Sequence, residues 1–265
     1  MDIHLKEDFR LLGLRLERWS TVFVIIIAVA AWELGVHTGV LSSLFFPPPS
    51  VILLTFTKLI INGKLATNAA ATLLRVFVGL GLGVVPGLIL GLVMGWSRRL
   101  YVLIDPFIAA THPIPKIAIL PLIMIIFGIG ESSKFVVVAV STFFPMLINT
   151  IAGVRQISPI HFEVAKNYGA NLFKIFTRVI VPGGLPLVIA GLRLALNMAL
   201  LITIAVELVS AQEGLGTMIW FAWQTLRTEE LYVSLGVTSA LGLIFNFLLQ
   251  RLAITLAPWQ IEQKN

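Results

Sequence analysis

Six long apolar runs constrain the fold of this chain more than any other feature of its sequence. Each run is long enough, within a few residues, for the roughly 20 residues that an α-helix needs to cross the hydrocarbon core of a bilayer. The chain is 58% hydrophobic and 12% charged, with a mean hydropathy of +0.97, which lies well outside the composition of soluble domains. The sequence therefore predicts an all-α membrane protein with about six transmembrane helices, at residues 20–41, 70–96, 100–127, 134–151, 184–210 and 233–257.

Basic residues are distributed unevenly between the two sides of these spans. Six spans place both termini on one side, which carries Lys6, Arg10, Arg15, Arg18, Arg98, Arg99, Arg155, Lys166, Lys174, Arg178, Arg251 and Lys264. The other side carries only Lys58, Lys64, Lys134 and Arg227. Because cytoplasmic loops are enriched in Lys and Arg, we expect a cytoplasmic segment at 1–19, a membrane domain at 20–257 and a cytoplasmic tail at 258–265.

The N-terminus admits a second interpretation. Basic residues before an apolar run, followed by Ala28-Val29-Ala30, resemble a signal peptide with its cleavage site. Acidic residues also occur in this leader, and hydrophobicity continues past Glu33 to Val40. These features favour an uncleaved first span, preceded by a short amphipathic helix at 2–19.

A polar segment at 158–182 interrupts the apolar runs, and its pattern predicts two short helices separated by a break. Ser158 can cap the first helix, and Pro159 suits its first position, where no amide donor is needed. One apolar face recurs at 3-4-3 spacing, formed by Phe162, Ala165, Gly169 and Leu172. Such a face suits either a soluble partner or the lipid headgroups, and the pattern alone leaves both open.

The same segment contains residues that are expected to end and to start helices. Gly169 can stop the first helix, and Asn171 can start the second. Pro182-Gly183-Gly184, followed by Pro186, is expected to break the chain before the next span.

This segment resembles a known family. Glu163-Val164-Ala165, Gly169 and Val179-Ile180-Val181-Pro182 are similar to the EAA loop of permease subunits of bacterial ABC importers. The usual form has Ala at position 164, Ile at 179 and Leu at 181, so the departures are conservative apolar exchanges. The resemblance implies a cytoplasmic coupling helix that docks on an ATPase subunit, with contacts from Phe162, Glu163, Ala165, Tyr168, Gly169, Leu172 and Pro182.

The resemblance extends from about Phe46 to the end of the chain. It is carried by residues 96–99, 121–122, 127–131, 144–145, 149–150, 153–155, 191–193 and 214–216, which look like the nitrate, sulfonate, taurine and bicarbonate branch of these permeases. It implies a type I importer fold in the bacterial inner membrane. The implied assembly has two permease copies, two cytoplasmic ATPases and a periplasmic or lipid-anchored solute-binding protein that delivers a small anionic solute.

Glycine recurs every fourth residue in the second predicted span. Gly79, Gly83, Gly87, Gly91 and Gly95 form a slowly winding groove without side chains. Helices in a membrane associate where small residues let their backbones approach, so we expect a helix to pack closely in this groove. Pro86 permits a kink within it.

The third predicted span is interrupted by prolines and is expected to be bent or partly unwound. Broken backbone at membrane depth is tolerated only against protein or water, and His112 and Lys116 lie in this part. Together with Arg193 and Glu207 they are candidates for the transport pathway, as are Glu33 and Arg75 among the other membrane charges. The alternative is structural: a snorkelling Lys116 or Arg75, and Arg193 and Glu207 as partners.

Two segments are expected on the outer side. Residues 45–50 contain successive prolines and should be extended, before an amphipathic helix at 51–61 that rests on the interface. Residues 212–232 contain Trp220, Trp223 and Glu229-Glu230. We expect these aromatic side chains to anchor at the interface and the exposed tips to contact a periplasmic partner.

Several function classes are excluded by missing motifs. Residues 79–83 and 128–134 are glycine-rich but lack GxGxxG and GxxxxGK[ST], so no cofactor site is predicted, and ATP and Mg²⁺ are expected on the partner ATPase. The chain has no cysteine and neither HExxH nor GxSxG, which argues against an enzyme. A secondary transporter or channel without an ATPase remains the alternative, although inverted repeats of spans are not evident.

Overall fold

The structure is a computed structural model that describes residues 22–258, and within that range every regular element is a helix. A helix at Val22–His37 is followed by α2 (Pro49–Ile61), α3 (Lys64–Trp96), α4 (Arg98–Thr111), a 3₁₀ turn (Lys116–Ile119), α5 (Leu120–Phe127) and α6 (Glu131–Arg155). The chain continues through α7 (Pro159–Asn167), α8 (Leu172–Ile175), a π-helical turn (Phe176–Ile180), α9 (Val181–Ser210), α10 (Leu215–Gln224) and α11 (Thr228–Leu256). The predicted cytoplasmic segment at 1–19 and almost all of the tail lie outside the described residues.

Among residues 22–258, four helices are long and apolar enough to cross a membrane, or five if a bent pair counts as one span. The four are α3, Leu172–Ser210, α6 and α11, which cover four of the predicted runs. The bent pair is Arg98–Thr111 with Lys116–Phe127, whose axes differ by 85°. This bend agrees with the proline pattern, whereas the predicted number of six spans is not confirmed, because the described part of the first predicted span is helical only over Val22–His37.

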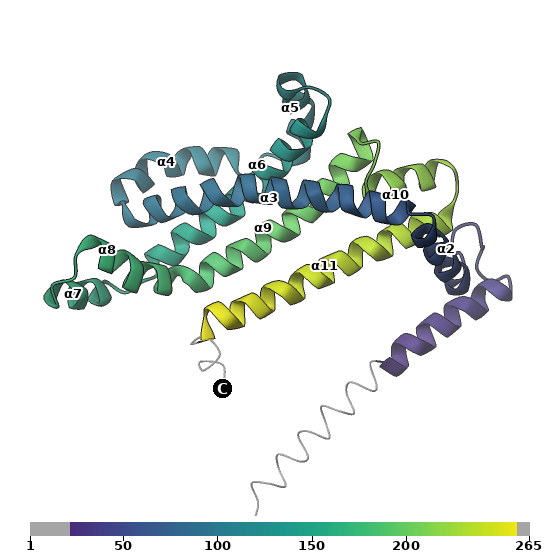
Figure 1. Cartoon of the computed structure of the whole chain (residues 1–265), viewed down its shortest axis with the longest axis horizontal. Helices are drawn as coiled ribbons and strands as arrows, with labels where there is room; N and C mark the ends of the chain where they lie inside the picture. Colours follow the sequence, from purple (N-terminus) through teal and green to yellow (C-terminus); the bar gives the residue numbers. More distant parts are fainter. Residues whose placement is uncertain (1–21, 259–265) are drawn as a thin grey trace, which may run out of the picture.

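Helices α3, α6 and α9 form the centre of the bundle, with α11 alongside α9 (Figure 1). Their buried side chains include Val76, Val137, Val138, Ala199 and Val206, each at most 1% exposed. The short helices α7 and α8 lie at one end with the start of α4, while α2 and α10 lie at the other end (Figure 1). The bundle therefore presents two different ends, each with its own short helices.

Every ladder glycine of α3 faces α6. A Cβ added at Gly87 would lie 2.8 Å from the carbonyl oxygen of Phe143, and one at Gly91 would lie 2.6 Å from Thr150 Cβ. Equivalent atoms on Gly79, Gly83 and Gly95 would meet residues 135–154 of the same helix. Because real Cβ atoms do not approach this closely, the α3–α6 spacing depends on these glycines.

Two expectations about chain breaks are wrong. The chain does not break at Pro182, since a continuous helix runs from Leu172 to Ser210. A π-helical turn just before Pro182 shifts the bonding pattern, so that Val181 N–H donates to Phe176, and proline's missing N–H is accommodated at the start of α9. Residues 45–50 are also not uniformly extended, because Pro49 occupies the first turn of α2, where proline needs no donor.

Candidate functional site

The α7–α8 segment is positioned by local capping. Pro159 stands at the first position of α7, but Ser158 makes no side-chain capping bond, contrary to expectation. Asn171 caps α8 as expected, because its Oδ1 accepts a hydrogen bond from Lys174 N–H at 2.9 Å. Gly169 separates the two helices with φ of +69°, a left-handed conformation that favours glycine.

The apolar faces of α7 are arranged differently from the predicted face. Phe162 and Ala165 are half-buried, whereas Leu172 is 72% exposed, so these residues do not share one outward face. The outward row is instead Ile160, Val164 and Tyr168, spaced four residues apart, and Tyr168 is 88% exposed. The residues of the predicted face are therefore divided between half-buried and exposed positions, and their role in coupling stays a prediction.

Two other residues assigned to coupling lie at different places around α7. Glu163 is exposed, and the structure gives it no ion-pair partner among the described residues. Pro182 and Ala165 line a cavity of about 500 Å³ between α7 and the start of α9. Val164 also lines this cavity, so the row of Ile160, Val164 and Tyr168 borders the space between α7 and the start of α9.

The bent third span brings His112 and Lys116 against the Phe144 ring of α6. Lys116 Nζ donates to the carbonyl oxygens of Thr111, His112 and Ile114, at 3.1, 2.8 and 2.8 Å, and so satisfies the end of α4. It also lies 4.5 Å from the centroid of the Phe144 ring, near the midpoint of α6. Lys116 is therefore a half-buried cation at mid-depth.

Arg193 also lies near mid-depth. It is exposed on α9, two residues after Gly191, whose added Cβ would lie 3.3 Å from the carbonyl of Pro145 on α6. The structure does not pair Arg193 with Glu207. Both belong to α9, and 14 residues of helix separate them by about 21 Å.

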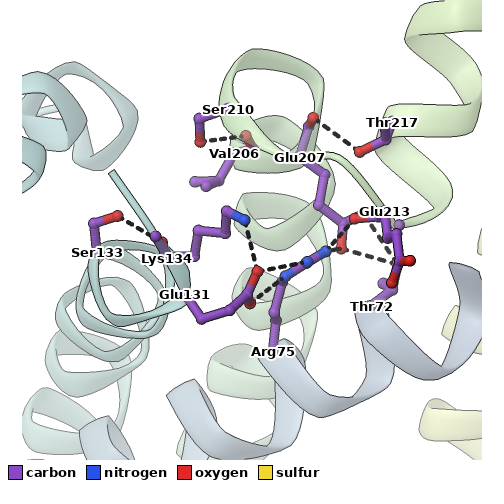
Figure 2. Close-up of polar contacts among 12 residues, drawn as sticks. Thr72, Arg75, Glu131, Ser133, Lys134, Val206, Glu207, Ser210, Glu213 and Thr217 are labelled. Carbon is purple, nitrogen blue, oxygen red and sulfur yellow. Dashed lines mark hydrogen bonds and ion pairs between the residues drawn. The ribbon is translucent and has the colours of Figure 1, made fainter. Parts of the chain in front are cut away.

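Glu207 belongs instead to a buried ion-pair network at the end opposite α7 (Figure 2). Arg75 Nη1 donates to Glu207 Oε1 at 2.7 Å, and Arg75 Nε and Nη2 donate to the two oxygens of Glu131 at 2.7 and 2.8 Å. Lys134 Nζ donates to Glu131 Oε1 at 2.7 Å. Two cations thus balance two carboxylates, and the pairing offsets the cost of burying Arg75 and Glu207, while the Glu131 side chain remains 45% exposed.

The network also holds the loop between α9 and α10. Asn68 Oδ1 accepts from Gly214 N–H at 2.7 Å, Thr72 Oγ1 accepts from Leu215 N–H at 2.9 Å, and Arg75 Nη1 donates to the Glu213 carbonyl at 2.6 Å. These three α3 residues follow 4-3 spacing and share one face. Glu207 accepts from Gly216 N–H at 2.9 Å, and at Gly214 a Cβ would strike its carboxylate.

Glu207 is therefore enclosed and does not line an open path. Its side chain is fully buried, and Thr72 Oγ1 lies 2.9 and 3.0 Å from its two oxygens. Sequence reasoning missed Glu131, Lys134 and Thr72 as its companions. Glu131 is the last residue of the motif at 127–131 and the first residue of α6. Its position in this motif, at the start of a helix, was the sequence signal that could have identified it.

Glu33 has a simpler role. Its carboxylate accepts from Ser50 N–H at 3.1 Å and Ser50 Oγ at 2.6 Å, so it joins the helix Val22–His37 to the first turn of α2. No cluster of His, Cys, Asp and Glu able to hold a metal ion occurs among residues 22–258.

Long apolar helices around one sharply bent span define a helical membrane protein, and the comparisons with known proteins specify it. Residues 83–260 match the family described as binding-protein-dependent transport system inner membrane component. The chain therefore belongs to this family of ABC importer permeases, and the predicted family membership is confirmed. A permease of this kind is non-catalytic, and ATP hydrolysis belongs to a separate subunit.

Three relatives align with this chain over most of their own length. The chain is 31% identical to the putative aliphatic sulfonates transport permease protein of Bacillus subtilis strain 168, over 88% of this chain and 85% of that protein. It is 30% identical to the taurine transport system permease protein of Escherichia coli strain K12, over 89% and 88%. It is 35% identical to the putative aliphatic sulfonates transport permease protein of the same strain, over 86% of each.

The fold is also similar to a solved structure. An inward-facing conformation of the MetNI methionine ABC transporter contains a chain that matches with a TM-score of 0.61 and 20% identity, over 70% of this chain and 92% of that chain. At this identity the likeness concerns the fold, which is of the type I importer class as expected.

Proposed function

We propose that two copies of this chain form the membrane pathway of an importer for a small organic sulfonate. A solute-binding protein would deliver the solute, and an ATPase would bind the α7–α8 segment on the cytoplasmic side. The transport of aliphatic sulfonates and taurine for which these relatives are named supports the substrate class. The excess of basic residues on the α7 side supports the orientation.

The observation that carries the coupling role is the outward row of Ile160, Val164 and Tyr168. These apolar side chains are 59%, 48% and 88% exposed at one end of the bundle, beyond the ends of α3 and α6. An exposed amphipathic helix with this row fits a hydrophobic groove on a soluble partner. In the assembled transporter, closure of two ATPases would move two such segments together and thereby reorient the spans.

Two cations beside the middle of the bundle support the proposal that the transported solute is an anion. Lys116 is half-buried at the bend, and Arg193 is exposed on α9 at a similar level of α6. A single copy has one coupling segment and an incomplete ring of spans, so a symmetric pathway requires a second copy. Weakly held cations along the interface between the copies would guide a sulfonate without trapping it.

The test uses substitutions that should spare the fold. Glu163→Lys and Gly169→Asp change exposed positions of the segment, and an added Cβ at Gly169 would meet nothing within 4 Å. We expect at least about a fivefold loss of ATPase co-purification together with loss of sulfonate uptake, because the few residues that dominate an interface each cost over about 1 kcal/mol when changed. Gly63→Asp is the matched control, since Gly63 also has a positive φ, +74°, but lies at the opposite end.

The possible outcomes of this experiment can be distinguished from one another. Wild-type co-purification and uptake in both coupling variants would leave α7 as an interfacial helix without a docking role. An equal defect in Gly63→Asp would indicate backbone strain instead. Competition by taurine and methanesulfonate, but not by nitrate, bicarbonate or acetate, is expected in uptake assays of the unmodified transporter.

A further inference from the structure

A basic cavity lies beneath α7, on the side opposite the outward row. It measures about 480 Å³ and is bounded by the ends of α3 and α6, by α7 and by the start of the helix that leads into α9. Its cationic lining residues are Arg98, Arg155 and Lys166, and no described carboxylate lines it. None of the three forms an ion pair with another described residue.

The rest of the lining is apolar. Phe162 and Leu172 face this cavity from the α7–α8 segment, and Ile175 and Ile180 contribute buried surface from the helix that follows. Trp96 ends α3 here and stacks against Phe176, with ring centroids 6.5 Å apart. A tryptophan at the end of a span is typical of the membrane–water interface, so the cavity lies at headgroup depth.

The N-terminus of α4 adds a positive electrostatic field that favours an anion in the cavity. Arg98 is the first residue of this helix, and Ser97 caps it by accepting from Leu100 N–H at 3.4 Å. The first N–H groups of a helix lack intrahelical acceptors, and the helix dipole favours negative charge there. Arg155 is held over the Tyr101 ring at 3.9 Å, so its guanidinium is restrained at the mouth of the cavity.

We propose that this cavity binds an anionic phospholipid, with the phosphate among Arg98, Arg155 and Lys166 and an acyl chain along the apolar lining. The proposal rests on the cytoplasmic placement of α7 proposed above. Basic pockets between spans on the cytoplasmic side suit anionic lipid headgroups, and the combination of three cations with apolar walls fits an amphiphile better than a soluble ion. Bound lipid would support the inner face of α7 and make the position of the coupling segment depend on lipid composition.

Fluorescence quenching of the full-length permease in detergent tests this site without any ATPase. Brominated phosphatidylglycerol and brominated phosphatidylcholine are titrated, and the signal of Trp96 is obtained as the difference between the wild type and Trp96→Phe. We expect phosphatidylglycerol to quench Trp96 at a concentration at least about fivefold lower. Each of Arg98→Gln, Arg155→Gln and Lys166→Gln should reduce this preference about fivefold, because one basic residue near a membrane contributes about 1 kcal/mol.

Arg99→Gln is the matched control, because Arg99 follows Arg98 but does not line the cavity. Arg98, Arg155 and Lys166 are all exposed, so each variant is expected to fold and any one of the three remains informative if another lowers the yield. Equal quenching by the two lipids, or an equal loss in Arg99→Gln, would overturn the site. Complete relief of quenching by soluble glycerol 3-phosphate would show that the cavity binds a free anion and not a lipid. If Lys166→Gln keeps the lipid preference but loses ATPase binding, the cations contact the ATPase and not a lipid.

The outcome is separable from that of the coupling test. Lipid preference is read on the permease alone, whereas coupling is read from ATPase co-purification. The lipid site can therefore fail while Glu163→Lys still releases the ATPase, and the reverse result is equally distinguishable.

Discussion

Individual polar residues are energetically decisive at the end of the bundle that carries α10. Arg75 is 4% exposed and bonds to both Glu131 and Glu207, so each carboxylate offsets part of the cost of removing its charge from water. The arrangement also makes Arg75 and Glu207 dependent on each other, since neither has water as a substitute partner. Loss of one partner should consequently cost more than loss of an exposed ion pair.

We predict that Glu207→Gln lowers the free energy of unfolding by about 3 kcal/mol, the lower part of the range for breaking a buried pair. Lys64→Gln removes the Lys64–Glu230 pair of 2.7 Å at the same end, and its 44% exposed side chain should make the loss less than about 1 kcal/mol. Unfolding by SDS titration in mixed micelles measures both. Equal losses in the two variants would contradict a special role of the buried network.

Among the elements, the α3–α6 pair depends most strongly on the absence of side chains. Five glycines at four-residue spacing follow a groove that meets α6 along almost its whole length. Lipid supplies little hydrophobic drive for helix association, so close backbone contact must supply much of the stability. The adjacent Gly81 belongs to the same helix but faces open space.

This contrast leads to a prediction for helix packing. Gly87→Leu and Gly91→Leu should destabilise the purified permease by at least about 1–3 kcal/mol through overpacking, and Gly91→Ala should already be harmful. Gly81→Leu should behave as the wild type, because nothing lies within 4 Å of its added Cβ. Yield, size-exclusion profile and SDS titration report the difference, and wild-type behaviour of both groove variants would rule out close packing as the basis of the ladder.

At the scale of the whole molecule, the bundle separates one end tied by ion pairs, beside α10, from the opposite end that carries α7 and α8 (Figure 1). Mid-depth charges lie between these ends, at the bend of the third span and on α9. The natural chain has no cysteine, so an introduced cysteine can be labelled uniquely. This property permits a direct test of the proposed pathway.

We predict that Arg193→Cys reacts with a water-soluble methanethiosulfonate reagent in the assembled transporter and is at least about threefold protected by taurine when uptake is active. A residue at a solvated pathway reacts, whereas a lipid-facing or buried one does not, because the reagent cannot enter hydrocarbon. Ala199→Cys is the control, since Ala199 lies further along α9 and is fully buried. Absence of labelling at 193 would remove Arg193 from the pathway.

Much of this molecule was determined by local sequence. Apolar run length defined the long helices, prolines defined the bent third span, and Asn171 and Gly169 defined the break between α7 and α8. Membrane burial, the proline ring and the backbone φ each act on a few neighbouring residues, so the local sequence is enough to predict these features. Only the tertiary structure decided that Glu207 pairs with Arg75 and that Ile160, Val164 and Tyr168 form the outward row of α7. Those outcomes depend on which helices meet, and helix periodicity defines faces without specifying which neighbour covers each one.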